Sequence, residues 1–382
     1  MSAAGPSASV QEAAAALGPH DERFMRLALA LGHRHLGLTW PNPSVGALVV
    51  DESEATPRIL AEGITQRGGR PHAERLALEA AGAAARGATL YVSLEPCAHT
   101  GRTPPCIEAA IAAGVTRVVT SIEDPDPRVS GKGHAALRAA GVTVVTGVLA
   151  DEARRAHRGH IARVTKGRPM VTLKLAQTAD GFAARASGPR LLITGEAANA
   201  RVHLMRAHAD ALLVGAGTVA ADDPLLTVRL PGLEQRSPVR VVLDPVLRAV
   251  SPSRLAAGAR ERPTWVFAGE HAPLDAERRL AASGVEVLRV AGSGRRLDLR
   301  EVLATLAVRG ITRVLCEGGP TLADALAAAG LIDEVVVVTG PARLDEAALP
   351  AFGPNLEAAL ALFRQVGSDA VGPDLLDRYE SA

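Results

Sequence analysis

The chain has 382 residues, of which 47% are hydrophobic and 22% are charged, a composition typical of a globular protein with two domains. The net charge is +1 and no long basic run occurs, which argues against a nucleic-acid partner. Three cysteines are too few for a disulfide scaffold, and no apolar stretch reaches the roughly 18 residues that would span a membrane. We therefore expect a cytoplasmic protein with neither a membrane nor a nucleic-acid partner.

The first half of the chain is predicted to alternate between helices and strands. Residues 1–20 are rich in Ala and Ser but lack a basic start and a long apolar run, so we expect a disordered tail rather than a signal peptide. A helix is expected from Asp21, which can cap it, because apolar residues recur at helical spacing from Phe24 to Leu31. Strands at 45–50 and 59–61 can pair as a hairpin. The other predicted elements are helices at 73–85, 107–113 and 135–140 and strands at 89–94, 117–121 and 142–145.

The second half resumes this alternation after a charged helix predicted at 151–164. Lys166, Gly167, Arg168 and Pro169 follow that helix, and we place the boundary there, between domains at 21–166 and 167–382. Beyond it we expect a helix at 197–208 and another that opens within 317–322 and runs to about residue 329. Strands are expected at 171–175, 211–214, 239–243, 264–267, 314–316 and 334–338. The pattern predicts an α/β fold in which helices cover both faces of a parallel or mixed sheet.

Three potential zinc ligands occur in the first half. His72 opens a predicted helix, Cys97 ends a strand after Pro96, and Cys106 opens the next helix. Taken alone, either cysteine could be a plain buried residue. One His and two Cys together leave a coordination position open, as catalytic zinc sites do, and a helix N-terminus favours the Cys106 thiolate. We therefore expect one zinc ion per chain, bound by His72, Cys97 and Cys106.

Glu74 is the expected proton carrier beside this zinc. It lies two residues after His72, where it can face a zinc-activated water rather than the metal. The order His-x-Glu, Pro-Cys and a later Cys is typical of zinc deaminases. Eight residues separate Cys97 from Cys106 where two are most common, so the strict spacing would miss the site. His99 is an alternative fourth ligand, which would close the site and leave Glu74 without a role.

Two segments of the second half could bind phosphate groups. Residues 317–322 follow a strand, contain two glycines and open a helix, so a phosphate could approach their backbone closely. A simple tight turn is the alternative, and the G-x-G-x-x-G pattern is absent. Near residues 222–229, Arg206 and Arg229 could bind phosphate through planar guanidinium groups. Alternatively, Asp222 caps a turn and Arg229 is a solvated surface residue.

The chain from about residue 21 to about residue 378 resembles the fused bifunctional deaminase–reductase family of riboflavin biosynthesis. The strongest matches are residues 41–46, 72–74, 94–106, 124–127, 221–229 and 317–322. The resemblance implies an N-terminal cytidine-deaminase-like three-layer α/β/α domain and a C-terminal dihydrofolate-reductase-like α/β domain. It also implies zinc on the three ligands above, with Glu74 as the proton shuttle.

The resemblance assigns further residues to cofactor and substrate. For NADPH it implies contacts from Ala176, Leu192, Thr218, Asp222, Gly319, Pro320 and Thr321. For a phosphorylated pyrimidine substrate it implies contacts from Asn42, Arg102, Lys174, Arg190, Arg206, Leu226, Arg229 and Glu317. Asn42 lies in a Pro-flanked turn similar to the one that presents an amide to the substrate ring, although a plain turn asparagine is the alternative. Arg102 lies in a loop similar to one whose Arg or Lys faces the substrate phosphate.

Three positions depart from the family pattern, all in the second half. Leu192 stands where the family usually has Trp, Arg190 where a small polar residue often contacts the substrate, and Pro245 where a polar residue lies near the cofactor. These departures concern how the reductase binds its ligands rather than whether it is a reductase. We expect NADPH by resemblance alone, since no residue points to a contact with its 2′-phosphate.

The implied chemistry has two steps. The first is hydrolytic deamination of 2,5-diamino-6-(ribosylamino)-4(3H)-pyrimidinone 5′-phosphate, and the second is NADPH-dependent reduction to 5-amino-6-(ribitylamino)uracil 5′-phosphate. Lys174, Asp222 and Glu317 all remain candidates for the proton donor of the reduction. A homo-oligomer is expected. Two alternatives are a nucleic-acid deaminase, which the near-neutral charge opposes, and a zinc-stabilised binding protein, which would need four protein ligands.

Overall fold

The structure is a computed structural model that describes residues 16–100, 104–185, 191–249, 252–293, 296–344 and 348–381. The chain forms two compact units. The first takes in the chain up to Arg34 together with Ser44–Gln66 and Arg70–His157, and the second takes in His35–Pro43, Arg67–Gly69 and the chain from Arg158 onward. Among the described residues, no helix combines the length and the apolar character that crossing a membrane would require.

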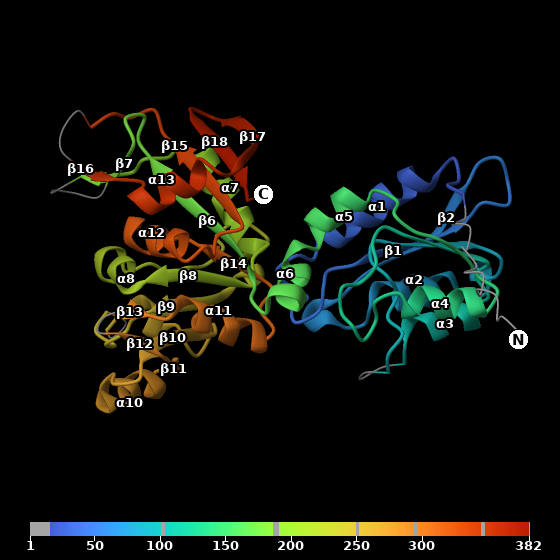
Figure 1. Cartoon of the computed structure of the whole chain (residues 1–382), viewed down its shortest axis with the longest axis horizontal. Helices are drawn as coiled ribbons and strands as arrows, with labels where there is room; N and C mark the ends of the chain where they lie inside the picture. Colours follow the sequence, from blue (N-terminus) through green and yellow to red (C-terminus); the bar gives the residue numbers. More distant parts are fainter. Residues whose placement is uncertain are drawn as a thin grey trace, which may run out of the picture. The chain divides into compact units, whose positions relative to one another are not determined.

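The first unit is built on a five-stranded mixed sheet in the order β2-β1-β3-β4-β5. The first strand is antiparallel to both of its neighbours, and the last three strands run parallel. The strands are β1 (Gly46–Asp51), β2 (Arg58–Ile64), β3 (Thr89–Val92), β4 (Arg117–Thr120) and β5 (Thr143–Val145), and the helices are α1 (Asp21–His33), α2 (Ala73–Ala81), α3 (Cys106–Ala113), α4 (Lys132–Ala139) and α5 (Ala150–Ala156). Figure 1 shows α1 and α5 on one face of this sheet and α2, α3 and α4 on the other.

Most elements predicted for this unit are confirmed, including the β1–β2 hairpin, but three details are wrong. Cys97 does not end a strand, because β3 stops at Val92 and Cys97 lies in the loop that follows. Asp21 begins α1 without capping it, because its carboxylate instead binds the guanidinium of Arg117 at 2.6 and 2.8 Å and the hydroxyl of Tyr91 at 2.9 Å. The single helix expected at 151–164 is two helices, α5 and α6 (Arg158–Lys166). They are separated at His157, whose buried imidazole lies 3.2 Å from the main-chain carbonyl of Ser93.

The second unit is built on a nine-stranded sheet in the order β11-β10-β9-β8-β14-β6-β15-β18-β17. Its first seven strands are parallel, and β18 and β17 form an antiparallel edge. The strands are β6 (Met170–Gln177), β8 (Ala211–Gly215), β9 (Val239–Leu243), β10 (Thr264–Gly269), β11 (Glu286–Val290), β14 (Arg313–Cys316), β15 (Glu334–Thr339), β17 (Arg364–Val371) and β18 (Asp374–Glu380). Two small sheets pair β7 (Phe182–Arg185) with β16 (Ala348–Pro350) and β12 (Gly292–Ser293) with β13 (Arg296–Leu297).

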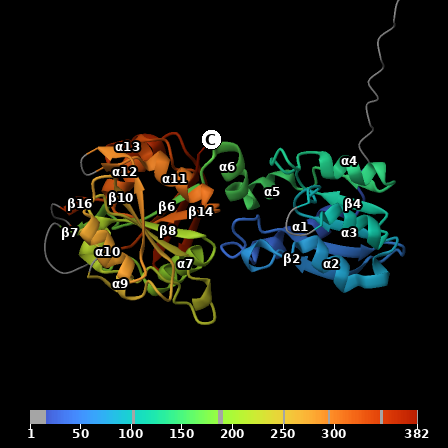
Figure 2. The same ribbon diagram turned by 90° about the horizontal axis from the view of Figure 1, so that it is seen from below.

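Helices cover both faces of the nine-stranded sheet, which explains why its central strands are apolar without alternation. The helices are α7 (Glu196–Ala207), α8 (Ala216–Asp222), α9 (Arg254–Ala257), α10 (Leu274–Ala282), α11 (Leu299–Val308), α12 (Pro320–Ala328) and α13 (Pro354–Leu360). Buried residues of α11, α12 and α13 share one core cluster with one face, and those of α8, α9 and α10 share another with the opposite face. Figure 2 shows α11, α12 and α13 on the side of the sheet opposite α7 and α9.

Candidate functional site

The structure brings the three predicted zinc ligands together at the start of two helices. His72 is the residue before α2, and Cys106 is the first residue of α3. Nδ1 of His72 lies 3.6 Å from Sγ of Cys97 and 3.4 Å from Sγ of Cys106, and all three ligand atoms lie within 4.8 Å of one another. One imidazole and two thiols at this separation fit a single zinc ion, which needs bonds of about 2.0–2.3 Å to each.

The two thiols differ in their affinity for a proton. The pKa of Cys97 is lowered to about 4, first by a hydrogen bond from the Cys106 thiol and then by His72. The pKa of Cys106 is raised, first by its hydrogen bond to Cys97 and then by burial. The main-chain N–H of Cys106 also donates to Sγ of Cys97 at 3.3 Å. The pair thus shares one proton, which zinc would displace because both thiols bind the metal as thiolates.

Glu74 lies in the same cluster, as the sequence predicts. It is buried in the first turn of α2, close to the thiols of Cys97 and Cys106. Burial raises the pKa of Glu74. A carboxyl group that holds its proton more strongly than usual, beside an open coordination position, is suited to taking up and returning a proton.

The first turn of α2 rests directly on strand β2. A Cβ atom at Gly63 would lie 2.0 Å from the main-chain oxygen of Ala73, the residue between His72 and Glu74. Because real side chains never approach a backbone oxygen so closely, only glycine at 63 allows this packing. Gly63 therefore allows the turn that contains one zinc ligand and the proton carrier to pack closely against strand β2.

Of the two substrate contacts expected near the zinc, the structure describes only Asn42. Asn42 belongs to the segment His35–Pro43 of the second unit, and its side-chain amide donates to the main-chain oxygen of Gly69 at 2.9 Å. Arg102 and, in the second half, Arg190 lie outside the described residues. His99 is half-buried, and its Nδ1 has no hydrogen-bond partner, but it is not part of the three-residue metal cluster found among the described residues.

The cofactor residues predicted in the second unit lie at the carboxyl ends of three adjacent parallel strands. β8 leads into α8, which contains Thr218 and ends at Asp222; β14 leads through Glu317 into α12; and β6 carries Ala176 near its end. Ligands of open α/β sheets bind at this edge.

Open space lies above the two helix starts at this edge. Gly319 is the residue before α12, Pro320 and Thr321 form its first turn, and a Cβ added at Gly319 or at Gly217 would meet nothing within 4 Å. Free main-chain N–H groups at the start of α12 suit a phosphate, so these residues fit a dinucleotide cofactor. Leu192 is 80% exposed, as expected of an apolar residue that a ligand covers.

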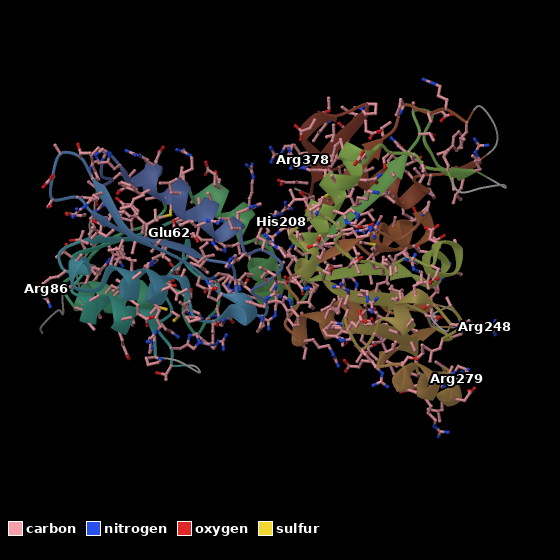
Figure 3. The ribbon with its side chains drawn as sticks, turned by 180° about the vertical axis from the view of Figure 1, so that it is seen from behind. Glu62, Arg86, His208, Arg248, Arg279 and Arg378 are labelled. Atoms are coloured by element: carbon pink, nitrogen blue, oxygen red, sulfur yellow. The ribbon has the colours of Figure 1, made fainter. Side chains whose placement is uncertain are left out.

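Arg206 and Glu317 form a buried bidentate ion pair. Nε and Nη2 of Arg206 each lie 2.7 Å from a carboxylate oxygen of Glu317, and the side chains are only 13% and 12% exposed. Nη1 of Arg206 donates to the main-chain oxygen of Thr227 at 3.0 Å. By contrast, Arg279 extends from α10 into solvent beside Asp275 (Figure 3). Arg206 is therefore not the free fork that the sequence suggested, and only two of its five N–H groups remain for a ligand.

The charge of Glu317 is stabilised by this pair. Burial opposes ionisation, but the hydrogen bonds and the charge of Arg206, with help from Lys174, keep the pKa of Glu317 below its usual range. Glu317 is thus an anion at neutral pH, so it cannot donate a proton there.

The loop that follows α8 presents Arg229. Leu226 is buried with a φ of 50°, a left-handed conformation that is strained for leucine. The main-chain N–H of Arg229 donates to Nδ1 of His203 at 3.2 Å, while its side chain is exposed. Burial, followed by the charges of Arg206 and Arg229, lowers the pKa of His203 to about 4, which keeps the imidazole neutral and able to accept this hydrogen bond.

The sequence interpretation missed two residues of these sites. His203 lies one helical turn before Arg206 on α7, so the i, i+3 spacing could have indicated it. Glu95, two residues before Cys97, accepts four main-chain hydrogen bonds from a distant segment and carries no local signal.

Comparison with known protein families gives two matches that follow one another along the chain. Residues 19–122 match the cytidine and deoxycytidylate deaminase zinc-binding region. Residues 169–376 match the RibD C-terminal domain. The three zinc ligands and Glu74 fall in the first match, and the Arg206–Glu317 pair falls in the second.

Several known proteins are similar to this chain over most of its length. The riboflavin biosynthesis protein RibD of Escherichia coli is 39% identical, with 93% of this chain and 98% of the relative aligned, and that of Aquifex aeolicus is 41% identical, with 85% and 88% aligned. Among solved structures, Acinetobacter baumannii RibD superposes with a TM-score of 0.83 at 36% identity, covering 95% of this chain and 99% of that one.

A second solved structure agrees. The Thermotoga maritima protein described as a diaminohydroxyphosphoribosylaminopyrimidine deaminase and 5-amino-6-(5-phosphoribosylamino)uracil reductase gives a TM-score of 0.80 at 35% identity, covering 94% of this chain and 98% of that one. The fold class and the family predicted from the sequence are thus confirmed. The chain belongs to the RibD family of riboflavin biosynthesis, in which a zinc-binding deaminase domain precedes a reductase domain.

Proposed function

We propose that the first unit deaminates 2,5-diamino-6-(ribosylamino)-4(3H)-pyrimidinone 5′-phosphate and that the second reduces the ribosyl chain of the product. The observation that carries this proposal is the pairing, in one chain, of a three-ligand metal cluster beside a buried carboxyl group with a second set of candidate ligand-binding groups, the Arg206–Glu317 pair and the start of α12. We place the boundary between the two activities at Lys166 and Gly167.

His72, Cys97 and Cys106 hold zinc in the deaminase. When bound by three side chains, zinc supplies an activated water molecule at neutral pH, because it lowers the pKa of that water to about 7. Glu74 takes the proton released by this water and returns it to the departing amino group, which leaves as ammonia. Its burial and raised pKa support both transfers. Asn42 and Arg102 are proposed to orient the pyrimidine ring and its phosphate.

The reductase residues bind NADPH and the deaminated substrate next to each other. NADPH, which supplies the hydride when bound, is assigned to Ala176, Leu192, Thr218, Asp222 and the α12 start at Gly319, Pro320 and Thr321. The substrate is assigned to Arg190, Leu226 and Arg229 together with the Arg206–Glu317 pair.

Of the three candidate proton donors, Lys174 is the one we propose. Glu317 is held as an anion by Arg206, and Asp222 is exposed at the end of α8. Lys174 lies on β6, close enough for its charge to lower the pKa of Glu317. Its ammonium group can therefore supply a proton beside the carboxylate that orients the substrate.

Product identification tests the proposal directly. The purified chain is incubated with the diaminopyrimidine phosphate, with and without NADPH. We expect the deaminated ribosylamino product without NADPH and the ribitylamino product with it, and NADH should be the poorer reductant. Metal analysis should give about one zinc per chain, and Cys106→Ser should lose both zinc and deamination. A Cys106→Ser protein that keeps full zinc and full deamination would refute the ligand assignment.

We also propose that the protein is a cytoplasmic homo-oligomer whose partners are small phosphorylated pyrimidines. The near-neutral charge of the chain and the exposed side chain of Arg229 support small anionic ligands. Light scattering of the purified chain measures the oligomeric state, and a monomer at cellular concentrations would contradict this part of the proposal.

A further inference from the structure

A buried carboxylate connects the zinc site to a distant segment of the first unit. Glu95 lies two residues before Cys97, and its side chain is fully buried. Its Oε2 accepts the main-chain N–H of Asp124 at 3.2 Å and of Gly131 at 3.0 Å. Its Oε1 accepts the main-chain N–H of Gly133 at 2.8 Å and of His134 at 3.2 Å. Every partner is a main-chain donor, so the carboxylate fixes the path of the backbone from 124 to 134.

Three of these four donors belong to the start of α4. Gly131 is the residue before the helix, and Gly133 and His134 lie in its first turn. The first N–H groups of a helix have no partner within the helix, and they favour an anion. No side chain of α4 itself caps this end. Glu95 thus caps α4 from the loop that follows strand β3.

The same contact fixes the chain that leads to Cys97. A Cβ at Gly133 would lie 2.3 Å from the main-chain oxygen of Pro96, so α4 rests against the residue between Glu95 and Cys97. The N–H of Glu95 donates to the oxygen of Ile122 at 3.0 Å, and the oxygen of Cys97 accepts from Ile107 in α3 at 3.4 Å. Main-chain contacts therefore hold Cys97 on both sides. The contact of α4 with Pro96 precedes it and depends on the Glu95 carboxylate, and the hydrogen bond from Ile107 is made by Cys97 itself.

The charge of Glu95 has no cationic partner among these contacts. Nδ1 of His134 lies 3.9 Å from Oε1 of Glu95, and burial lowers the pKa of that imidazole. Nε2 of His134 instead faces the hydroxyl of Thr120 at 2.9 Å. The four main-chain N–H groups therefore stabilise the Glu95 carboxylate. An amide in its place would set its own N–H₂ against some of them, leaving buried donors without acceptors.

We propose that Glu95 is a positioning residue for zinc: by capping α4 it holds Cys97 at the place where the thiolate meets His72 and Cys106, and so sets how tightly the metal is retained. Both oxygens of the carboxylate accept main-chain N–H groups, and Glu95 is not part of the three-residue metal cluster found among the described residues. Residues that orient metal ligands typically affect metal affinity by about 10–100-fold. The inference concerns zinc retention, so it stands or falls separately from the identity of the pyrimidine substrate.

The test compares zinc release from Glu95→Gln with release from a matched control. Asp21→Asn removes another buried carboxylate of the same unit, which binds Arg117, Tyr91 and the N–H of Gly18 and has no contact with a zinc ligand. Both full-length variants, loaded with zinc, are mixed with a chromogenic chelator, and thermal unfolding is measured in parallel. We expect Glu95→Gln to release zinc roughly 10–100-fold faster than the wild type. Asp21→Asn should lose thermal stability but release zinc at the wild-type rate.

The absorption spectrum of the cobalt(II)-loaded protein provides a second measurement, which a general loss of stability would leave unchanged. In cobalt-loaded Glu95→Gln the thiolate-to-cobalt absorption should weaken or shift, whereas cobalt-loaded Asp21→Asn should match the wild type. If Glu95→Gln does not fold, Glu95→Asp decides by the same criteria, because it keeps the charge but is one methylene too short to reach all four donors. Wild-type release from the Glu95 variant, or equally fast release from Asp21→Asn, would overturn the proposal.

Discussion

Replacing Glu317 with Gln should destabilise the second unit by about 3–5 kcal/mol, because removing one partner of a buried ion pair leaves the other charge uncompensated. The pair is bidentate, with two contacts of 2.7 Å, and both side chains are nearly excluded from water. Glutamine keeps one acceptor but turns an N–H₂ group toward the guanidinium of Arg206. For a unit of this size the loss corresponds to a fall of roughly 6–20 °C in the unfolding midpoint.

Differential scanning calorimetry of the full chain measures this effect, and the zinc-dependent deamination provides an internal control, since the zinc ligands belong to the first unit and the ion pair to the second. Reduction should be lost in Glu317→Gln while deamination persists at temperatures below the new midpoint. The double variant Arg206→Met/Glu317→Leu should regain most of the stability, because apolar replacements of a buried pair are often neutral or stabilising, but it should not regain reduction. A midpoint unchanged in Glu317→Gln, or a double variant no more stable than the single one, would refute the reasoning.

Three further outcomes follow from the described contacts. Arg229→Ala should raise the reductase KM for its phosphorylated substrate about 10–100-fold, the value of one charged hydrogen bond to phosphate, and leave deamination unchanged in steady-state assays; an equal loss of both activities would contradict separate sites. Glu74→Gln should keep its zinc by metal analysis but lower kcat for deamination by about 10²–10⁴, so near-normal turnover would show that another group moves the proton. The pKa of His203 is lowered from 6.5 to about 4, by burial first and then by Arg206 and Arg229, so its contribution to stability is complete above pH 6.5 and is lost as the pH falls toward 4, where the unfolded chain binds the extra proton. His203→Asn should flatten this acid limb in urea midpoints measured against pH, and an unchanged limb would contradict the assignment to His203.

The zinc site could be predicted because its chemistry is local and restrictive. Few residue types bind zinc. His72 and Glu74 lie together at the start of α2, and Pro96 and Cys97 are adjacent in the loop that follows β3. The parallel strands of the second unit were equally visible, since burial on both faces makes them continuous apolar runs. The edge strand β17 was not visible, because most of its residues are exposed or half-buried and no apolar period marks it.

Long-range pairings explain what the sequence did not reveal. Arg206 and Glu317 are 111 residues apart, so nothing local indicates that each is committed to the other. The four partners of Glu95 lie 29 to 39 residues away and are main-chain groups, which any residue type provides. A side chain whose partners are backbone atoms leaves no trace in residue composition, and only the folded chain reveals it.

Gly63 limits how the deaminase half can change through evolution. It contributes no side chain to the site, yet the oxygen of Ala73 would lie 2.0 Å from any Cβ placed there. A substitution at 63 would therefore displace the turn carrying His72 and Glu74. No exchange of residue 73 could relieve the clash, since every amino acid has the same main-chain oxygen. A library of single substitutions screened for deamination should accordingly find position 63 as intolerant as the zinc ligands themselves.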